Sequence, residues 1–129
     1  MPVTVVAVLT AKPGLGAAVI ESFREVSPLV HAEPGCELYA AHLEQDGDTV
    51  VMVERWATRG DLDAHAGGAA LRRLNELNQD LLQRPYDVWF LDPVPLGHPA
   101  KGTVERHGMR AASSSDGVTT GSPSTRSSS

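Results

Sequence analysis

The sequence predicts an α+β domain with the element order βαββαβ, and two observations support this class. Short runs rich in β-branched and aromatic residues alternate with longer segments in which apolar residues recur every three or four positions. Asp-Gly and Pro-Gly pairs separate these segments, as turns between elements require. This order is the split-βαβ or ferredoxin-like pattern, and the length of 129 residues suits one such domain, since domains most often have about 100–150 residues.

The first three elements follow from local patterns. Residues 3–11 are rich in Val and predict a strand, which a Lys-Pro-Gly turn ends. Residues 15–33 carry apolar side chains at helical spacing, so they predict a helix, and Pro28 predicts a kink or an early end. A Glu-Pro-Gly turn then leads to a second strand over residues 36–45.

The middle of the chain predicts a hairpin followed by a helix. An Asp-Gly pair between two apolar runs is typical of a hairpin and leads to a third strand over residues 49–57. Thr58, with Asp61 three residues later, resembles a helix-capping box with Asp in place of Glu. We therefore expect a helix that begins after Thr58 and runs through His65.

The last elements and the tail complete the predicted domain. A Gly-Gly pair breaks or bends the helix, and Leu side chains on one side predict a second helical piece over residues 70–83. Residues 86–92 form the last strand, which a Pro-Val-Pro segment stops. We expect the folded domain to span residues 1–96. Residues 97–129 are rich in Ser, Thr and Gly without hydrophobic periodicity, which is typical of a disordered tail.

The composition argues against several classes of protein. Residues 1–97 carry 7 Lys and Arg against 14 Asp and Glu, and such an acidic domain is a poor binder of nucleic acid. One cysteine allows no intrachain disulfide, and no His or Cys spacing typical of a metal site occurs. No phosphate loop or glycine-rich dinucleotide motif is present, so we expect no metal and no nucleotide cofactor. The chain has no long apolar run and no basic amino-terminal segment, so we expect a cytoplasmic protein without a membrane contact.

The strands predict a homodimer. Val51 and Val53 alternate with Val50 and Met52, so both faces of the third strand are apolar, and the first and last strands show the same pattern. Two helices can cover only one face of a four-stranded sheet. A second copy that packs sheet to sheet with two-fold symmetry would cover the other face.

The candidate site lies where the third strand meets the following helix. Met52, Glu54 and Trp56 share one face of that strand, and His65 on the helix can fold back over them. The space between sheet and helices would then be an apolar cavity with a few polar groups, which is typical of a ligand site. Tyr39 on the second strand lines this cavity or lies at the dimer interface, and strand parity does not decide between the two. A core Trp and a structural His are the simpler alternatives for Trp56 and His65.

Three segments carry a resemblance to a known family: Glu-Pro-Gly-Cys at residues 33–36, Glu-Arg-Trp at residues 54–56 and Asp-Ala-His at residues 63–65. In this order and spacing, over residues 3–94, the chain resembles the antibiotic biosynthesis monooxygenase domain, which includes small quinol monooxygenases. The resemblance implies a ferredoxin-like domain of the dimeric α/β-barrel type that oxygenates an aromatic substrate with O₂ and without metal or flavin. The haem-degrading branch has an Asn where this chain has Ala7, so haem degradation is disfavoured. The polyketide branch has an Asn where this chain has Met52, so an oxyanion-type donor is missing, which argues against activity on polyketides.

The implied reaction fixes roles for the site residues. Triplet O₂ without a cofactor needs an electron-rich substrate, such as a deprotonated quinol, phenol or aromatic polyketide. The resemblance makes His65 the base and Trp56 a partner that stacks on the substrate or donates its indole N–H. Met52, Glu54 and Tyr39 are the expected substrate contacts. The alternatives are a non-catalytic dimeric module that binds a small hydrophobic metabolite, or a polyketide cyclase or isomerase.

Overall fold

The computed structural model describes residues 2–104 and confirms the predicted fold class. Its helices and strands all lie in one compact unit, Met1–Asp92. The second unit, Pro93–Ser129, has no helix or strand over its described residues 93–104. Most of the predicted tail, from residue 105 onward, lies outside the described residues.

The four strands form one antiparallel sheet. Strands β1 (Val3–Thr10), β2 (Cys36–Leu43), β3 (Thr49–Trp56) and β4 (Asp87–Leu91) are arranged in the order β2-β3-β1-β4. The predicted hairpin joins β2 to β3, and Asp46 adopts a positive φ of 58° in its turn. Each strand is one or two residues shorter than its sequence pattern predicted. Beyond the ends of β1 and β3, Ala11 pairs with Leu82 in an isolated bridge, and the Ala57 N–H donates to the Gly35 carbonyl oxygen.

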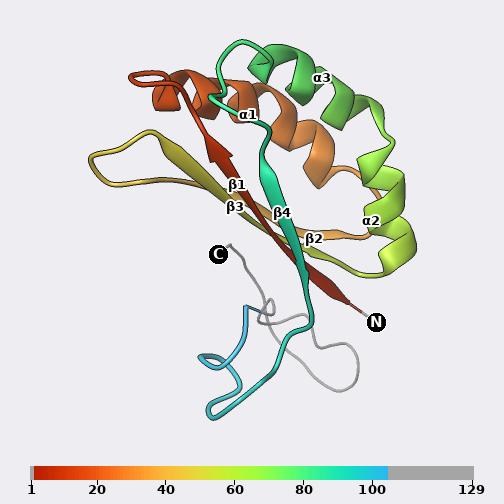
Figure 1. Cartoon of the computed structure of the whole chain (residues 1–129). Helices are drawn as coiled ribbons and strands as arrows, with labels where there is room; N and C mark the ends of the chain where they lie inside the picture. The colour runs from red at the N-terminus through yellow and green to blue at the C-terminus, as the bar shows by residue number, and fades with distance from the viewer. Residues whose placement is uncertain (1, 105–129) are drawn as a thin grey trace. The chain divides into compact units, whose positions relative to one another are not determined.

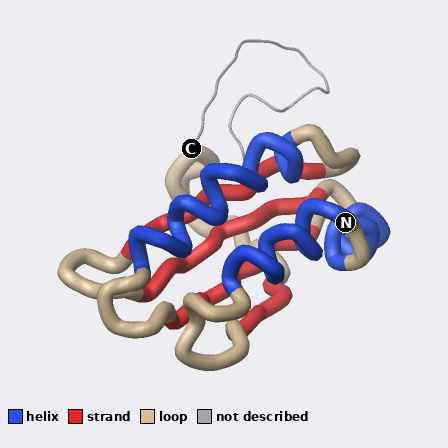
Figure 2. Tube along the Cα trace, turned by 90° about the horizontal axis from the view of Figure 1, so that it is seen from above, coloured by secondary structure: helices blue, strands red, loops and turns tan. Residues whose placement is uncertain are grey.

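Three helices cover one face of this sheet, as Figures 1 and 2 show. Helix α1 (Gly16–His31) lies over the β2–β3 side, helix α2 (Arg59–Ala66) follows β3 directly, and helix α3 (Ala69–Asn78) packs on α1. The predicted early end at Pro28 is wrong, since α1 continues through Pro28 to His31. Proline removes only one backbone donor, and the buried Val26 and Val30 on either side of it pack the helix into the core.

The predicted last helical piece was too long. Helix α3 ends at Asn78, whose carbonyl oxygen accepts from the N–H groups of Leu81 and Leu82 and so closes a turn. Leu82 then pairs with Ala11 in an isolated bridge. Tertiary pairing with the end of β1 therefore overrides the helical pattern of leucines.

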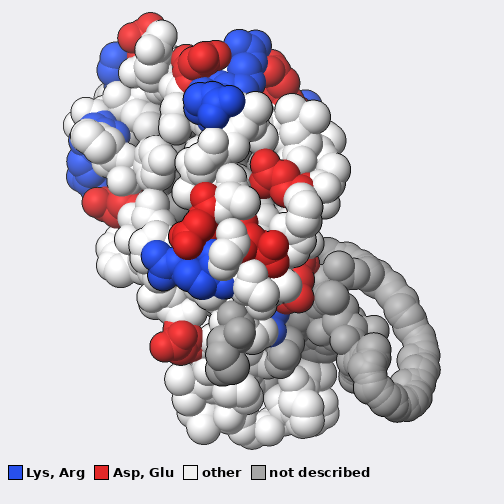
Figure 3. Space-filling view, turned by 90° about the vertical axis from the view of Figure 1, so that its right-hand side faces the viewer, with Lys and Arg blue, Asp and Glu red and all other residues white. Residues whose placement is uncertain are grey.

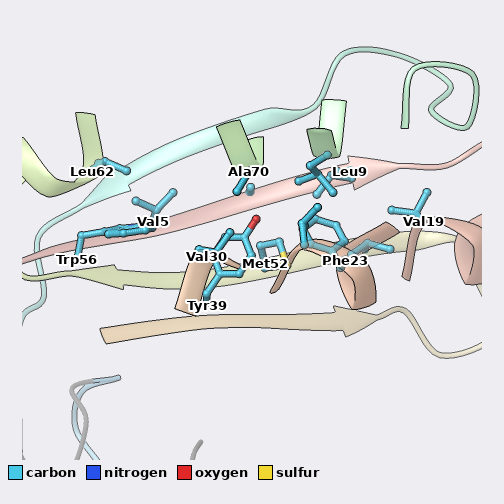
Figure 4. Packing of buried hydrophobic residues seen from close by; sticks show 14 of the residues in the cluster. Val5, Leu9, Val19, Phe23, Val30, Tyr39, Met52, Trp56, Leu62 and Ala70 are labelled. Carbon is cyan, nitrogen blue, oxygen red and sulfur yellow. The ribbon is translucent and has the colours of Figure 1, made fainter. Parts of the chain in front are cut away.

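The core lies between the helices and the inner face of the sheet, where the largest fully buried side chains are Trp56 and Met52. Figure 4 shows Trp56 at one end of this core, Val19 at the other, and Tyr39 and Met52 between them. The inner residues of β3 alternate with half-buried Val51 and Val53 on the opposite face, as the strand pattern predicted.

Two surface properties bear on function. No helix over residues 2–104 is long and apolar enough to cross a membrane. On the face displayed in Figure 3, Lys and Arg side chains lie among Asp and Glu side chains and form no continuous basic surface.

Candidate active site

The junction between β3 and α2 is fixed by an N-terminal cap. The Thr58 hydroxyl accepts a hydrogen bond from the Asp61 N–H at 3.0 Å and donates to the Asp61 carboxylate at 2.9 Å, so the predicted cap is confirmed. Helix α2 therefore starts one residue after Thr58. This start places His65 in the last turn of α2, on the side that faces the sheet, where it is buried.

His65 lies among aromatic side chains from two strands. Its ring stacks on the Trp56 indole, with centroids 4.6 Å apart and an interplanar angle of 29°. The Tyr39 ring meets the imidazole edge-on at 5.6 Å. These contacts hold the plane of the imidazole in one orientation.

A carboxylate fixes which imidazole nitrogen is available for chemistry. His65 Nδ1 lies 2.7 Å from Glu33 Oε1, in the turn between α1 and β2. A carboxylate accepts hydrogen bonds, so Nδ1 carries the proton of the neutral ring and Nε2 keeps a free lone pair. A base held in one tautomer by a carboxylate is the arrangement that proton-transfer sites use.

The turn that contains Glu33 packs closely against the start of α2. Gly35 has a φ of +79°, and its carbonyl oxygen accepts from the Ala57 N–H at 2.8 Å. A Cβ at Gly35 would collide with the Asp61 carboxylate, which already belongs to the helix cap. Only glycine fits this close approach without strain, and the approach sets the position of Glu33 relative to His65.

Glu54 is the second carboxyl group of the site. It is 6 % exposed, on the inner face of β3, and Oε1 accepts a hydrogen bond from the Trp56 indole N–H at 3.1 Å. Burial raises the pKa of the Glu54 carboxyl, and the nearby Glu33 carboxylate also raises it. The Trp56 hydrogen bond and the charge of protonated His65 lower this pKa without cancelling the effect of burial.

A cavity of about 220 Å³ lies beside these groups, between the sheet and helices α2 and α3. Its polar lining residues are His65, Glu54, Tyr39 and Tyr86. The remaining walls are apolar and come from the sheet and all three helices: Val5, Ala7, Leu9, Phe23, Met52, Leu62, Ala66, Leu71, Leu74, Val88 and Phe90. A mostly apolar cavity with polar groups of this kind suits an aromatic ligand with one or two hydroxyl groups.

The structure brings together four of the five predicted site residues at the cavity: His65, Met52, Glu54 and Tyr39. Trp56 does not line the cavity, contrary to expectation. Its side chain is fully buried, His65 covers one face of the ring, and Glu54 accepts from its N–H. Trp56 therefore contacts His65 and Glu54 and presents neither an exposed face nor its N–H to the cavity.

Tyr39 lies on the cavity side of the sheet, which decides between its two predicted locations. A register irregularity between Cys36 and Leu38 places both Cys36 and Tyr39 on the inner face. Burial raises the pKa of the Tyr39 hydroxyl far above its ordinary value, with Glu54 adding to the effect, so Tyr39 is a neutral hydrogen-bonding group.

Two further observations concern the Cys36 thiol and the arrangement of possible metal ligands. Burial raises the pKa of the Cys36 thiol to about 11, and the Glu33 and Glu54 carboxylates add to this shift, so the thiol is protonated at neutral pH. Over residues 2–104, no group of three His, Cys, Asp or Glu side chains is arranged to hold a metal ion.

Glu33 is the site residue that reasoning from the sequence missed. It stands 32 positions before His65, in a Pro-Gly turn where an acidic residue is ordinary. The sequence feature that could have identified Glu33 is the Glu-Pro-Gly-Cys motif. This motif contributes to the family resemblance, but its local pattern predicts only a turn.

Comparison with known proteins agrees with this geometry. Residues 2–77 match the family model described as antibiotic biosynthesis monooxygenase. A curated Mycobacterium tuberculosis protein, named "Putative monooxygenase Rv0793", is 30% identical over 93 residues, which cover 72% of this chain and 92% of that protein.

Solved structures show the same fold. The structure of Rv0793 from Mycobacterium tuberculosis matches with a TM-score of 0.68 and 28% identity, over 76% of this chain and 100% of that one. The crystal structure of PA3566 from Pseudomonas aeruginosa matches with a TM-score of 0.64 and 28% identity, over 70% of this chain and 91% of that one. The chain therefore belongs to the antibiotic biosynthesis monooxygenase family.

Proposed function

We propose that this protein is a monooxygenase that uses O₂ without a cofactor to hydroxylate a quinol or a related phenolic aromatic. Family membership and a relative named as a monooxygenase support the reaction class. The mostly apolar cavity with a few polar groups supports the substrate class, because an aromatic ring can lie against its walls while its hydroxyl group meets His65.

The observation that carries the proposal is the Glu33–His65 pair at the cavity. The 2.7 Å contact leaves Nε2 of His65 unprotonated in the neutral ring, and His65 lines the cavity. Nε2 can therefore accept the hydroxyl proton of a bound quinol, and Glu33 stabilises the imidazolium that results. The stacked Trp56 keeps the ring in place during this transfer.

The rest of the reaction follows from the electron-rich quinolate. The ring gives electrons to O₂, a C–O bond forms at a ring carbon, and the peroxide later loses water. One oxygen atom enters the ring and the other leaves as water, so a quinol and O₂ give a hydroxyquinone and H₂O. The protein supplies the base and a cavity that limits water near the peroxide.

The test is oxygen consumption with a reduced naphthoquinol such as menadiol, prepared anaerobically, with ¹⁸O₂ as the label. The proposal expects enzyme-dependent O₂ uptake above the autoxidation rate and one ¹⁸O atom in a hydroxylated product. Tight binding of the quinol without uptake would reject the oxygenase and favour the non-catalytic binding module.

We also propose that the protein is a homodimer that packs through the sheet face opposite the helices. Val6, Val53 and Trp89 lie side by side on this face in the strand register, and Trp89 is 50% exposed. An apolar row of this kind on a sheet face is expected to be covered by a partner. Light scattering after size exclusion tests this, and a monomeric mass at micromolar concentration would contradict it.

A further inference from the structure

We infer that Glu54 is a second catalytic residue, which holds a proton and delivers it to the departing oxygen when the O–O bond of the substrate peroxide breaks. The inference rests on the proposed oxygenase and assigns the acid that this reaction needs in addition to its base. It separates two roles between two side chains of the same cavity.

The geometry places Glu54 where a proton donor is required. Glu54 and His65 both line the cavity, and both contact Trp56, one at the edge of the indole and the other on its face. A substrate whose hydroxyl meets His65 therefore occupies the cavity that Glu54 also lines. The Trp56 hydrogen bond is made to Oε1, so Oε2 is the oxygen that carries the transferable proton.

The surroundings of Glu54 favour the protonated acid. The carboxyl is 6 % exposed, and no salt bridge to Glu54 occurs among the described residues. The titratable groups around it come from four segments: Glu33 in the α1–β2 turn, Cys36 and Tyr39 on β2, His65 on α2 and Tyr86 before β4. Of these, only His65 can bring a positive charge, and Glu33 already neutralises it.

The proton balance closes with these two groups. His65 first takes the hydroxyl proton of the quinol, and the ring forms a C–O bond to O₂ with its electron pair. The proton on His65 then passes to the outer peroxide oxygen. In the next step His65 takes the C–H proton at the oxygenated carbon, the electron pair of this bond forms C=O, and the O–O bond breaks. The departing hydroxide takes the Glu54 proton and leaves as water, and His65 returns its proton to Glu54.

Without the acid, the substrate peroxide can decompose by another reaction. Loss of the whole peroxide group gives the quinone and H₂O₂ from the same quinol and O₂, and this route needs no O–O cleavage. A general acid typically accelerates a step by about 10²–10⁴-fold, so its removal should divert most of the flux to H₂O₂. The ratio of hydroxylated product to H₂O₂ therefore reports on Glu54 separately from the overall rate.

The experiment compares the wild type with E54Q, using menadiol, O₂ uptake, peroxide detection and product analysis. Gln keeps the size of Glu and can still accept the Trp56 hydrogen bond, so the fold should be retained. We expect a fall of tenfold or more in the ratio of hydroxylated product to H₂O₂, on the order of the loss expected for a general acid, and this ratio does not depend on the overall rate of O₂ uptake. E21Q, on the exposed surface of α1, is the matched control and should keep the wild-type ratio.

The outcomes separate this inference from the proposed function. A wild type that incorporates no ¹⁸O rejects the oxygenase itself. A wild type that hydroxylates, together with an E54Q ratio equal to it, overturns the role of Glu54, and so does an equal loss of both products. If E54Q fails to fold, the shorter pair E54D and E54N makes the same comparison, because only E54D keeps an acid.

Discussion

Substituting Glu33 with Gln should slow turnover of a quinol substantially while leaving the fold intact. Glu33 holds Nδ1 of His65 at 2.7 Å and stabilises the positive charge that His65 acquires as a base. Gln has almost the same volume, so the substitution removes the charge and leaves the side chain in place. The Gln amide can also donate to Nδ1, which would turn the imidazole to the tautomer that cannot accept a proton at Nε2.

The expected magnitude follows from the burial of the pair. The side chains of His65 and Glu33 are 5% and 22% exposed, so solvent screens their interaction only in part. A hydrogen bond to a charged group contributes about 1.5–3 kcal/mol. If the transition state loses this amount, kcat/KM falls by about 10- to 150-fold, because about 1.36 kcal/mol corresponds to a tenfold change in rate.

The assay is steady-state O₂ uptake with menadiol, with E37Q as the matched control. Glu37 lies in the same region of the chain, its side chain is 21% exposed, and it pairs with Arg55 at 2.8 Å. Arg55 leaves β3 on the side opposite Glu54 and the cavity. E37Q therefore removes a similar ion pair and should leave kcat/KM within about twofold of the wild type.

Two results would refute this reasoning. If E33Q and E37Q lower kcat/KM equally, Glu33 acts through stability and not through His65. If E33Q keeps wild-type kcat/KM and a wild-type pH profile, the imidazole does not need the carboxylate, and His65 loses its support as the base.

Four further predictions follow from the site and the sheet. H65A should lower kcat by about 10²–10⁴-fold and, since it leaves Glu33 without its partner, should also cost about 1–3 kcal/mol in a urea titration; unchanged turnover would reject the base. G35A should destabilise the fold by about 1–3 kcal/mol, because a side chain at positive φ is strained, and thermal unfolding that matches the wild type would contradict the close packing of this turn. Burial raises the pKa of Glu54 in the folded state above its ordinary value of 4.5. The contribution of Glu54 to the free energy of unfolding is therefore fully present below pH 4.5 and is lost as the pH rises through the folded-state pKa. E54Q should therefore gain stability over the wild type as the pH increases above 4.5, and a pH-independent difference in unfolding free energy would count against a buried acid. V53D should dissociate or unfold the proposed dimer, because it buries an unpaired charge, whereas a dimer of wild-type affinity in light scattering would move the interface elsewhere.

Most of the fold could be predicted from local patterns. The Val-rich runs, the Asp-Gly turn and the Thr58–Asp61 cap act over a few residues, so their consequences are the same in any fold that contains them. Strand parity on β3 also gave the inner positions of Met52 and Glu54, since the third strand is regular throughout. The predicted ends of two helices were wrong, at Pro28 in α1 and at the end of α3, because tertiary contacts determine where these helices end.

The site depended more on tertiary structure. Parity could not place Tyr39, because the irregularity between Cys36 and Leu38 changes the alternation of β2. Trp56 was predicted to contact a substrate. In the structure, His65 stacks on its ring and Glu54 accepts its N–H. No sequence pattern indicates which side chains cover a buried ring.

The sequence by itself determined the order of the elements, the inner face of the central strand and the family, because these depend on short-range periodicity and on motifs with fixed spacing. Only the tertiary structure decided that Glu33 partners His65 and that Trp56 is covered by His65 and Glu54 and does not line the cavity. Glu33 is 32 residues from His65, and their 2.7 Å contact exists because the Gly35 turn packs against the start of α2. Proton-transfer chemistry depends on such distances and on burial, and both arise only when segments distant in the chain are packed together.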